Sequence, residues 1–151
     1  MKFDLDIRTD PALETFFKTF PTRLRNVLLT AAMRKAAEPV LTQAKSNVAS
    51  HVRRTGQKTD PIWAGLRIRA GKRRRGAVRV VVMTPPRAAL GISADDKWYY
   101  PAHIELGTRD TPALPFLRPA LQQTRQEAQE IVRRELAKGL EALSRGRIRG
   151  R

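Results

Sequence analysis

The stretch from Trp98 to Leu121 constrains the fold more than any other part of the chain, because its hydrophobic period changes from that of a strand to that of a helix. Residues 100–106 alternate between apolar and other side chains, as one face of a half-buried strand does. Gly107 and Thr108 break this pattern, and prolines punctuate the polar loop that follows. A helical period begins at Pro119, where a proline fits because that N–H lacks a partner anyway. The stretch therefore predicts a strand, an ordered loop and a helix start.

The stretch also predicts particular roles for several of its residues. Phe116 and Leu117 are predicted to fill the space between sheet and helix and to anchor the loop to the core. Glu105 and Arg118 are expected to lie close together as an exposed pair, worth about 0–1 kcal/mol. Gly107 is required if its backbone has a positive φ or passes close to a neighbour. Because proline cannot donate to a ladder, Pro101 predicts an edge position or a bulge in the strand.

Two long helices are predicted from apolar residues that recur every three or four positions. The first runs from Thr22 to about Ser50, and Pro39 inside it predicts a bend near Ala36. The second follows Pro119. The apolar stripes are Leu24, Val27, Leu28, Ala31, Ala32, Leu41, Ala44 and Val48 in the first helix, and Leu117, Leu121, Thr124, Ala128, Ile131, Val132, Leu136, Leu140 and Leu143 in the second.

Short alternating segments predict the remaining strands. Residues 66–70 predict a strand with one wet face, and residues 78–82 predict a more buried one that is joined to it by a long hairpin. Residues 1–9 predict a short edge strand, Asp10-Pro11 predicts the start of a short helix, and residues 51–61 and 84–97 predict loops.

Together these elements predict an α+β fold, with an antiparallel sheet of three to four strands packed against two long helices. The length of 151 residues fits a single domain, which we place at residues 1–144. Residues 145–151 are predicted to be a basic, disordered tail, because the segment is too polar and glycine-rich to pack alone.

The charge balance is strongly basic. Thirty Lys and Arg residues against 14 Asp and Glu give a net charge of +16, which favours a polyanion, either nucleic acid or an acidic protein surface. The alternative is that these charged side chains are simply solvent-exposed and bind no partner. The candidate contacts for a polyanion or a partner are Lys72, Arg73, Arg74, Arg75, Arg145, Arg147, Arg149 and Arg151.

The sequence contains no recognisable catalytic or ligand-binding motif, so we expect that the protein is not an enzyme and binds no metal or cofactor. There is no cysteine, no phosphate-binding glycine loop and no nucleophile elbow. His51 falls in a predicted loop, and His103 shares the polar face of the predicted strand with Glu105. A solvated strand face explains that pair better than a metal or proton site does. The N-terminus has acidic residues where a signal peptide needs an apolar core, so we expect the chain to stay in the cytoplasm. No apolar run is long enough to predict a membrane-spanning helix.

Four blocks carry a resemblance to a known family. They are Met33–Leu41 in the first helix, Arg54–Gly56 after it, Tyr99–Tyr100 with Glu105–Thr108, and Pro115–Leu121. Their order, over residues 24–130, resembles the tail-completion, or head–tail joining, proteins of long-tailed bacteriophages, the lambdoid gene-ten-type tail component family. The basic 72–75 segment, the 84–97 loop and the Arg/Gly tail depart from the family pattern. The resemblance rests on the motif residues Tyr100, Glu105, Gly107, Thr108, Pro115, Phe116, Leu117, Arg118 and Pro119.

The resemblance implies a virion structural protein at the head–tail interface, made in the host bacterial cytoplasm. It implies a hexameric ring that caps the tail tube and docks to the head connector or stopper, with tail tube or tail terminator proteins on the other side. DNA passes through the centre of such a ring, so the expected partners include DNA in the lumen, bound without sequence preference. No membrane is expected among the partners. The alternative is a free basic nucleic-acid-binding protein of prophage or nucleoid type.

Overall fold

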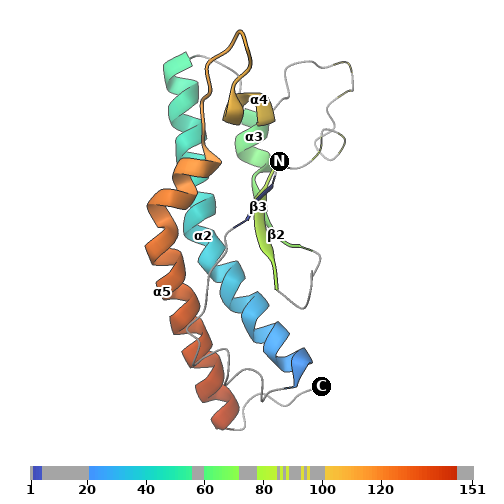
Figure 1. Cartoon of the computed structure of the whole chain (residues 1–151), viewed down its shortest axis with the longest axis vertical. Coiled ribbons are helices and arrows are strands. Elements are labelled where there is room, and N and C mark those ends of the chain that lie inside the picture. The colour runs from blue at the N-terminus through green and yellow to red at the C-terminus, as the bar shows by residue number, and fades with distance from the viewer. Residues whose placement is uncertain are drawn as a thin grey trace.

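The computed structural model describes residues 2–4, 21–55, 60–71, 78–84, 86, 88, 93, 95 and 101–145. These residues form an α+β fold, drawn in Figure 1, in which α2 lies between α5 and the strands. The elements are β1 (Lys2–Asp4), α2 (Thr22–Thr55), α3 (Asp60–Gly65), β2 (Arg67–Ala70), β3 (Val80–Met83), α4 (Pro101–Leu106) and α5 (Leu117–Ser144).

The sheet is antiparallel and has the strand order β1-β3-β2. The central position of β3 explains its three consecutive buried valines, Val80, Val81 and Val82. Val82 is paired with Ile68 of β2 and with Phe3 of β1. The predicted strands at 66–70 and 78–82 are therefore confirmed, and β1 lies within the predicted edge strand at 1–9.

Helix α2 has 34 residues and contains Pro39, so it is about 50 Å long at about 1.5 Å per residue. It is buried on two sides. Val40, Ala44 and Val48 pack with the sheet, whereas Ala32 and Ala36 pack with α5. Small residues allow both neighbours to approach closely. Two members of the predicted stripe are wrong, because Val27 is 59% exposed and Ala31 is exposed as well.

Helix α5 packs along α2 through Ala128, Val132 and Leu136. Every residue of its predicted stripe is buried or half-buried, so that prediction is confirmed. At the far end of the pair, a Cβ built on Gly139 lies 2.8 Å from Leu28 Cδ2, which shows how closely the two helices approach. The sheet meets the helices mainly through α2, and the start of α5 joins the same core cluster through Leu117 and Ala120.

The predicted strand through residues 100–106 is wrong, because Pro101–Leu106 is helix α4. Pro101 occupies its first turn, where a missing N–H is harmless, rather than a sheet edge or a bulge. The alternation of Ala102, Ile104 and Leu106 reflected no buried face, since Ala102 and Leu106 are exposed. A helix of six residues is too short to display a period of 3.6.

The predicted loop at 51–61 is also wrong in part. α2 continues to Thr55, so His51 lies in a helix, and α3 begins at Asp60. Asp60-Pro61 resembles a helix-starting pair, and α3 buries Ile62, which is 2% exposed. In the described part of the chain, no helix is long and apolar enough to cross a membrane.

Candidate functional site

A buried carboxylate joins α4 to the start of α5. Glu105 is 3% exposed. Its Oε2 accepts the backbone N–H groups of Phe116 at 2.7 Å and Leu117 at 2.9 Å, and its Oε1 accepts that of Arg118 at 2.9 Å. Charged acceptors make short, strong hydrogen bonds, and a carboxylate is favoured at the positive end of a helix. These three bonds compensate the cost of burying the charge.

Residues 116–119 are the positions of α5 whose N–H groups have no partner inside the helix. Glu105 satisfies the first three, and the fourth residue, Pro119, has no N–H. Phe116 is the N-cap residue and makes no side-chain cap bond, because a phenyl ring has no acceptor atom, and the ring is fully buried in the core. The cap therefore comes from another helix, and it leaves the N-cap side chain free to fill the core.

The loop between α4 and α5 is held by its own backbone. Gly107, at φ +75°, ends α4 with an N–H bond of 2.7 Å to the His103 carbonyl, as an αL helix cap does. Thr108 N–H donates to Thr111 O at 2.9 Å, and the Leu114 N–H returns to Ile104 O at 2.7 Å. The loop is thus closed on α4 at both of its ends.

Helix α2 fixes the same loop from the side. Asn47 Nδ2 donates to Phe116 O at 3.0 Å. His51 Nε2 lies 3.1 Å from Pro115 O, and a carbonyl only accepts, so Nε2 is the donor. The loop end is therefore tied to α2 and to α4, and Phe116 and Leu117 lie in the same core cluster as Val80 and Val82 of the sheet. The prediction that Phe116 and Leu117 fill the space between sheet and helix is therefore confirmed.

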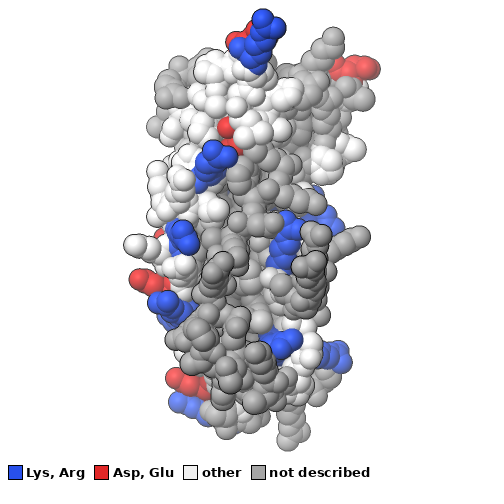
Figure 2. Space-filling model, viewed as in Figure 1, with Lys and Arg blue, Asp and Glu red and all other residues white. Residues whose placement is uncertain are grey.

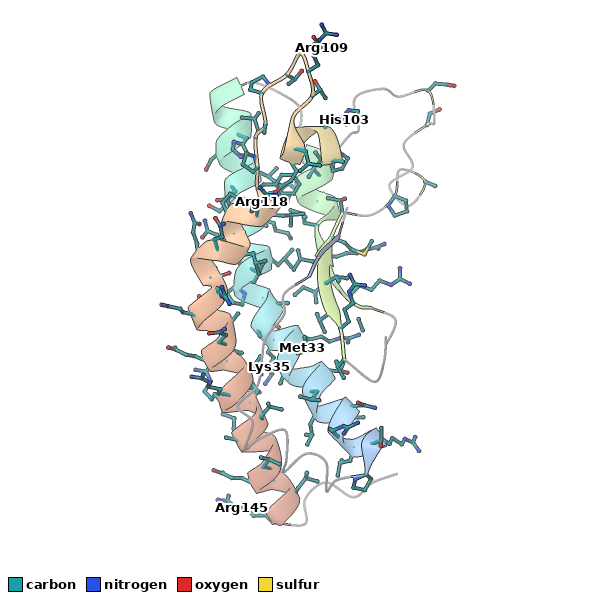
Figure 3. All side chains as sticks on the ribbon, in the orientation of Figure 1. Met33, Lys35, His103, Arg109, Arg118 and Arg145 are labelled. Carbon is teal, nitrogen blue, oxygen red and sulfur yellow. The ribbon has the colours of Figure 1, made fainter. Side chains whose placement is uncertain are left out.

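The tip of this loop projects from the molecule. Residues 108–113 are all exposed, and Figure 3 shows Arg109 at the extreme end of the molecule, pointing away from it. Asp110 N–H lies 3.3 Å from Thr108 Oγ1, which closes the turn at the tip. A tip of this kind, whose backbone is held at its base, presents its side chains to solvent, and loops on rigid scaffolds commonly carry binding.

The predicted pair of Glu105 and Arg118 forms differently from the expectation. The two residues do interact, but through the Arg118 backbone N–H, while the Arg118 side chain is exposed and Glu105 is buried. The predicted face shared by His103 and Glu105 is wrong as well. On a helix the two positions diverge, and His103 is exposed. Among the described residues, no group of three or more His, Cys, Asp or Glu is placed to hold a metal ion.

The basic residues predicted as contacts are placed only in part. Arg145 follows the last turn of α5, is exposed, and lies with its Nη2 3.9 Å from Glu141 Oε2. Tyr100, Lys72, Arg73, Arg74, Arg75, Arg147, Arg149 and Arg151 lie outside the described residues, as do the predicted short helix after Asp10 and most of the 84–97 loop.

A groove of about 490 Å³ lies between α2 and α5, and the sequence did not point to it. Lys35 and Glu135 meet across the two helices with Nζ 2.5 Å from Oε2, and Lys138 Nζ lies 3.3 Å from Oε1. The hydrogen bond from Lys35 is the main reason that the pKa of Glu135 lies below its ordinary value, and Lys138 lowers it further. Lys35 and Glu135 are 100 positions apart, so no local spacing could reveal the contact.

Comparison of the chain with protein-family models, with curated proteins and with solved structures finds no match.

Proposed function

We propose that this chain is a virion structural protein that joins the head and tail of a long-tailed bacteriophage. In this proposal it forms a hexameric ring that caps the tail tube and docks to the head connector. The observation that carries it is the bonding of Glu105 to Phe116, Leu117 and Arg118. These bonds join two of the blocks that carry the family resemblance, Glu105–Thr108 and Pro115–Leu121, into one structural unit, which supports the proposal.

The geometry supports an assembly role through the loop tip. Residues 108–113 are exposed on a base that is tied to α4, α5 and α2. A pre-ordered tip loses little conformational entropy when it binds, which favours association. In the proposed ring this tip contacts the neighbouring subunit or the partner ring. The finer architecture, including the number of strands that a subunit contributes, belongs to the same proposal.

A free basic nucleic-acid-binding protein is the second candidate, and the net charge of +16 favours it. The two candidates differ in where the protein is found. A head–tail joining protein is built into particles at a fixed stoichiometry, whereas a free nucleic-acid-binding protein stays with the nucleic acid of the host cell.

Electron microscopy of a lysate tests the proposal. The gene is deleted from the phage or prophage genome that encodes it and is then supplied again from a plasmid. We expect the deletion to yield separate DNA-filled heads and tails, and the plasmid to restore joined particles. A plasmid that encodes Glu130→Gln, a change on the exposed face of α5, should also restore them. Fully joined, infectious particles in the deletion lysate would contradict the proposal.

A further inference from the structure

Strand β2 carries exposed arginines on one face. Its residues alternate in exposure, with Arg67 and Arg69 exposed and Ile68 and Ala70 half-buried. Because alternate residues of a strand point to the same face, Arg67 and Arg69 project together, about 6.7 Å apart along the strand. Ile68 faces the core, where it packs against the cluster that includes Val80 and Val82.

A third arginine extends this row through a glycine. Gly71 directly follows β2 and continues the same alternation, and its N–H donates to Arg79 O at 2.8 Å. A Cβ built on Gly71 would lie 3.1 Å from Cδ and 3.2 Å from Cγ of Arg79. The stem of Arg79 therefore lies over Gly71, in the space that any other side chain at that position would fill. Arg67, Arg69 and Arg79 thus form one row, here called the arginine row.

The arginine row lies in a basic part of the surface. The register places Met83 and then Lys2 across the sheet from Arg67, and Val81 and then Asp4 across from Arg69. Figure 2 shows Lys and Arg side chains over the strands, with no acidic side chain drawn beside them among the residues described. In sequence, Lys72, Arg73, Arg74 and Arg75 directly follow Gly71. Among the described side chains, the charge beside the arginine row is therefore positive (Figure 2).

We propose that the arginine row binds the phosphate backbone of double-stranded DNA without sequence preference. The row spans about 13 Å, and phosphates on one strand of a duplex recur every 3.4 Å or so along the axis, so the row covers about four of them. Guanidinium groups match phosphate oxygens with two parallel hydrogen bonds. A regular row suits a regular line of phosphates better than the irregular carboxylates of an acidic protein. This contact does not depend on head–tail joining, so it can be tested with the purified chain.

The test compares two variants of the full chain with the same loss of charge. Arg67→Gln with Arg69→Gln removes two members of the row, and Arg125→Gln with Arg133→Gln removes two exposed arginines of α5. All four side chains are exposed, so both variants should melt with the wild type. Fluorescence anisotropy with a labelled duplex of arbitrary sequence then gives affinity at several salt concentrations.

Each phosphate contact contributes about −0.9 to the slope of log affinity against log salt. We expect the row variant to reduce the steepness of the slope by about 1.8 and the α5 variant to leave it within error. Equal decreases in both variants, no decrease in the row variant, or no binding by the wild type would overturn the proposal. Binding of poly-L-glutamate in place of DNA, lost in the row variant, would overturn it in favour of an acidic protein partner.

Discussion

Glu105 and Pro119 divide between them the four backbone positions at the start of α5, which in most helices carry N–H groups without an intrahelical partner. The carboxylate accepts from residues 116, 117 and 118, and Pro119 has no N–H to donate. The helix start therefore depends on a residue in a different helix. Any change at Glu105 should affect α4, the loop and α5 together.

Replacement of Glu105 by Gln should destabilise the fold. The amide has one acceptor oxygen in place of two and carries no charge, so at least one buried N–H loses its partner, at a cost of about 1–3 kcal/mol. Urea unfolding measures this difference in the free energy of unfolding. The control is Glu130→Gln, which changes the same chemistry on the exposed face of α5. Equal stability of the Glu105→Gln variant and the wild type would show that the carboxylate cap is dispensable.

Two glycines should respond oppositely to alanine. At Gly107, φ is +75° and a Cβ would lie 2.8 Å from the backbone N of Ala113, so Gly107→Ala should cost about 1–2 kcal/mol for the φ alone, and more for the clash. At Gly139 the nearest atom is the end of the Leu28 side chain, which can rotate away. Because alanine favours a helix by about 1 kcal/mol over glycine, Gly139→Ala should be neutral or stabilising. Thermal melting of both variants checks the contrast, and equal losses would contradict it.

Truncation of Phe116 tests how much its buried ring contributes to stability. The ring is fully buried in the cluster shared by α2, the sheet and α5, so Phe116→Ala should cost about 3–5 kcal/mol. Leu106→Ala is the matched control, because Leu106 is 60% exposed and its loss should change stability little. Phe116→Leu keeps part of the apolar volume and should fall between the two. A melting temperature of Phe116→Ala within error of the wild type would be incompatible with a buried ring.

The ion pair across the groove predicts a pH dependence. Because Lys35 and Lys138 lower the pKa of Glu135 below 4.5 in the folded chain, the unfolded chain binds this proton more tightly. The stabilisation by Glu135 is therefore fully present above pH 4.5 and is lost as the pH falls through the lowered pKa. Glu135→Gln should melt below the wild type at pH 7, and the difference should shrink on acidification. A difference that stays constant from pH 7 to pH 3 would contradict this assignment.

The long helices were predictable, and the short one was not. The stripe of α5 repeats over 28 residues, so chance apolar residues do not obscure it. Helix α4 has six residues, and its apolar positions alternate without facing the core. What places Glu105 inside is the approach of α5 from a later part of the chain, which no local pattern contains. The predicted link between Glu105 and Arg118 identified the right residues but assigned the bond to the wrong group of Arg118.

The arginine row was hidden for a related reason. The alternation of residues 66–70 predicted a wet face, but Arg79 joins it only because the hairpin register places Arg79 opposite Gly71. Register depends on the whole ladder, not on the spacing within either strand. The errors at Val27 and Ala31 have a similar origin, because α2 is buried on two sides and a single-stripe interpretation does not describe such a helix.

Hydrogen exchange at three backbone amides tests the Glu105 cap most directly, and both the fold and the proposed function rest on that cap. In the wild type, the N–H groups of Phe116, Leu117 and Arg118 should be strongly protected, although the first turn of a helix normally exchanges fast. In Glu105→Gln their protection should fall, while amides in the middle of α5 keep theirs relative to global unfolding. Exchange of these three amides in the wild type at the rate of an unstructured peptide would contradict the account.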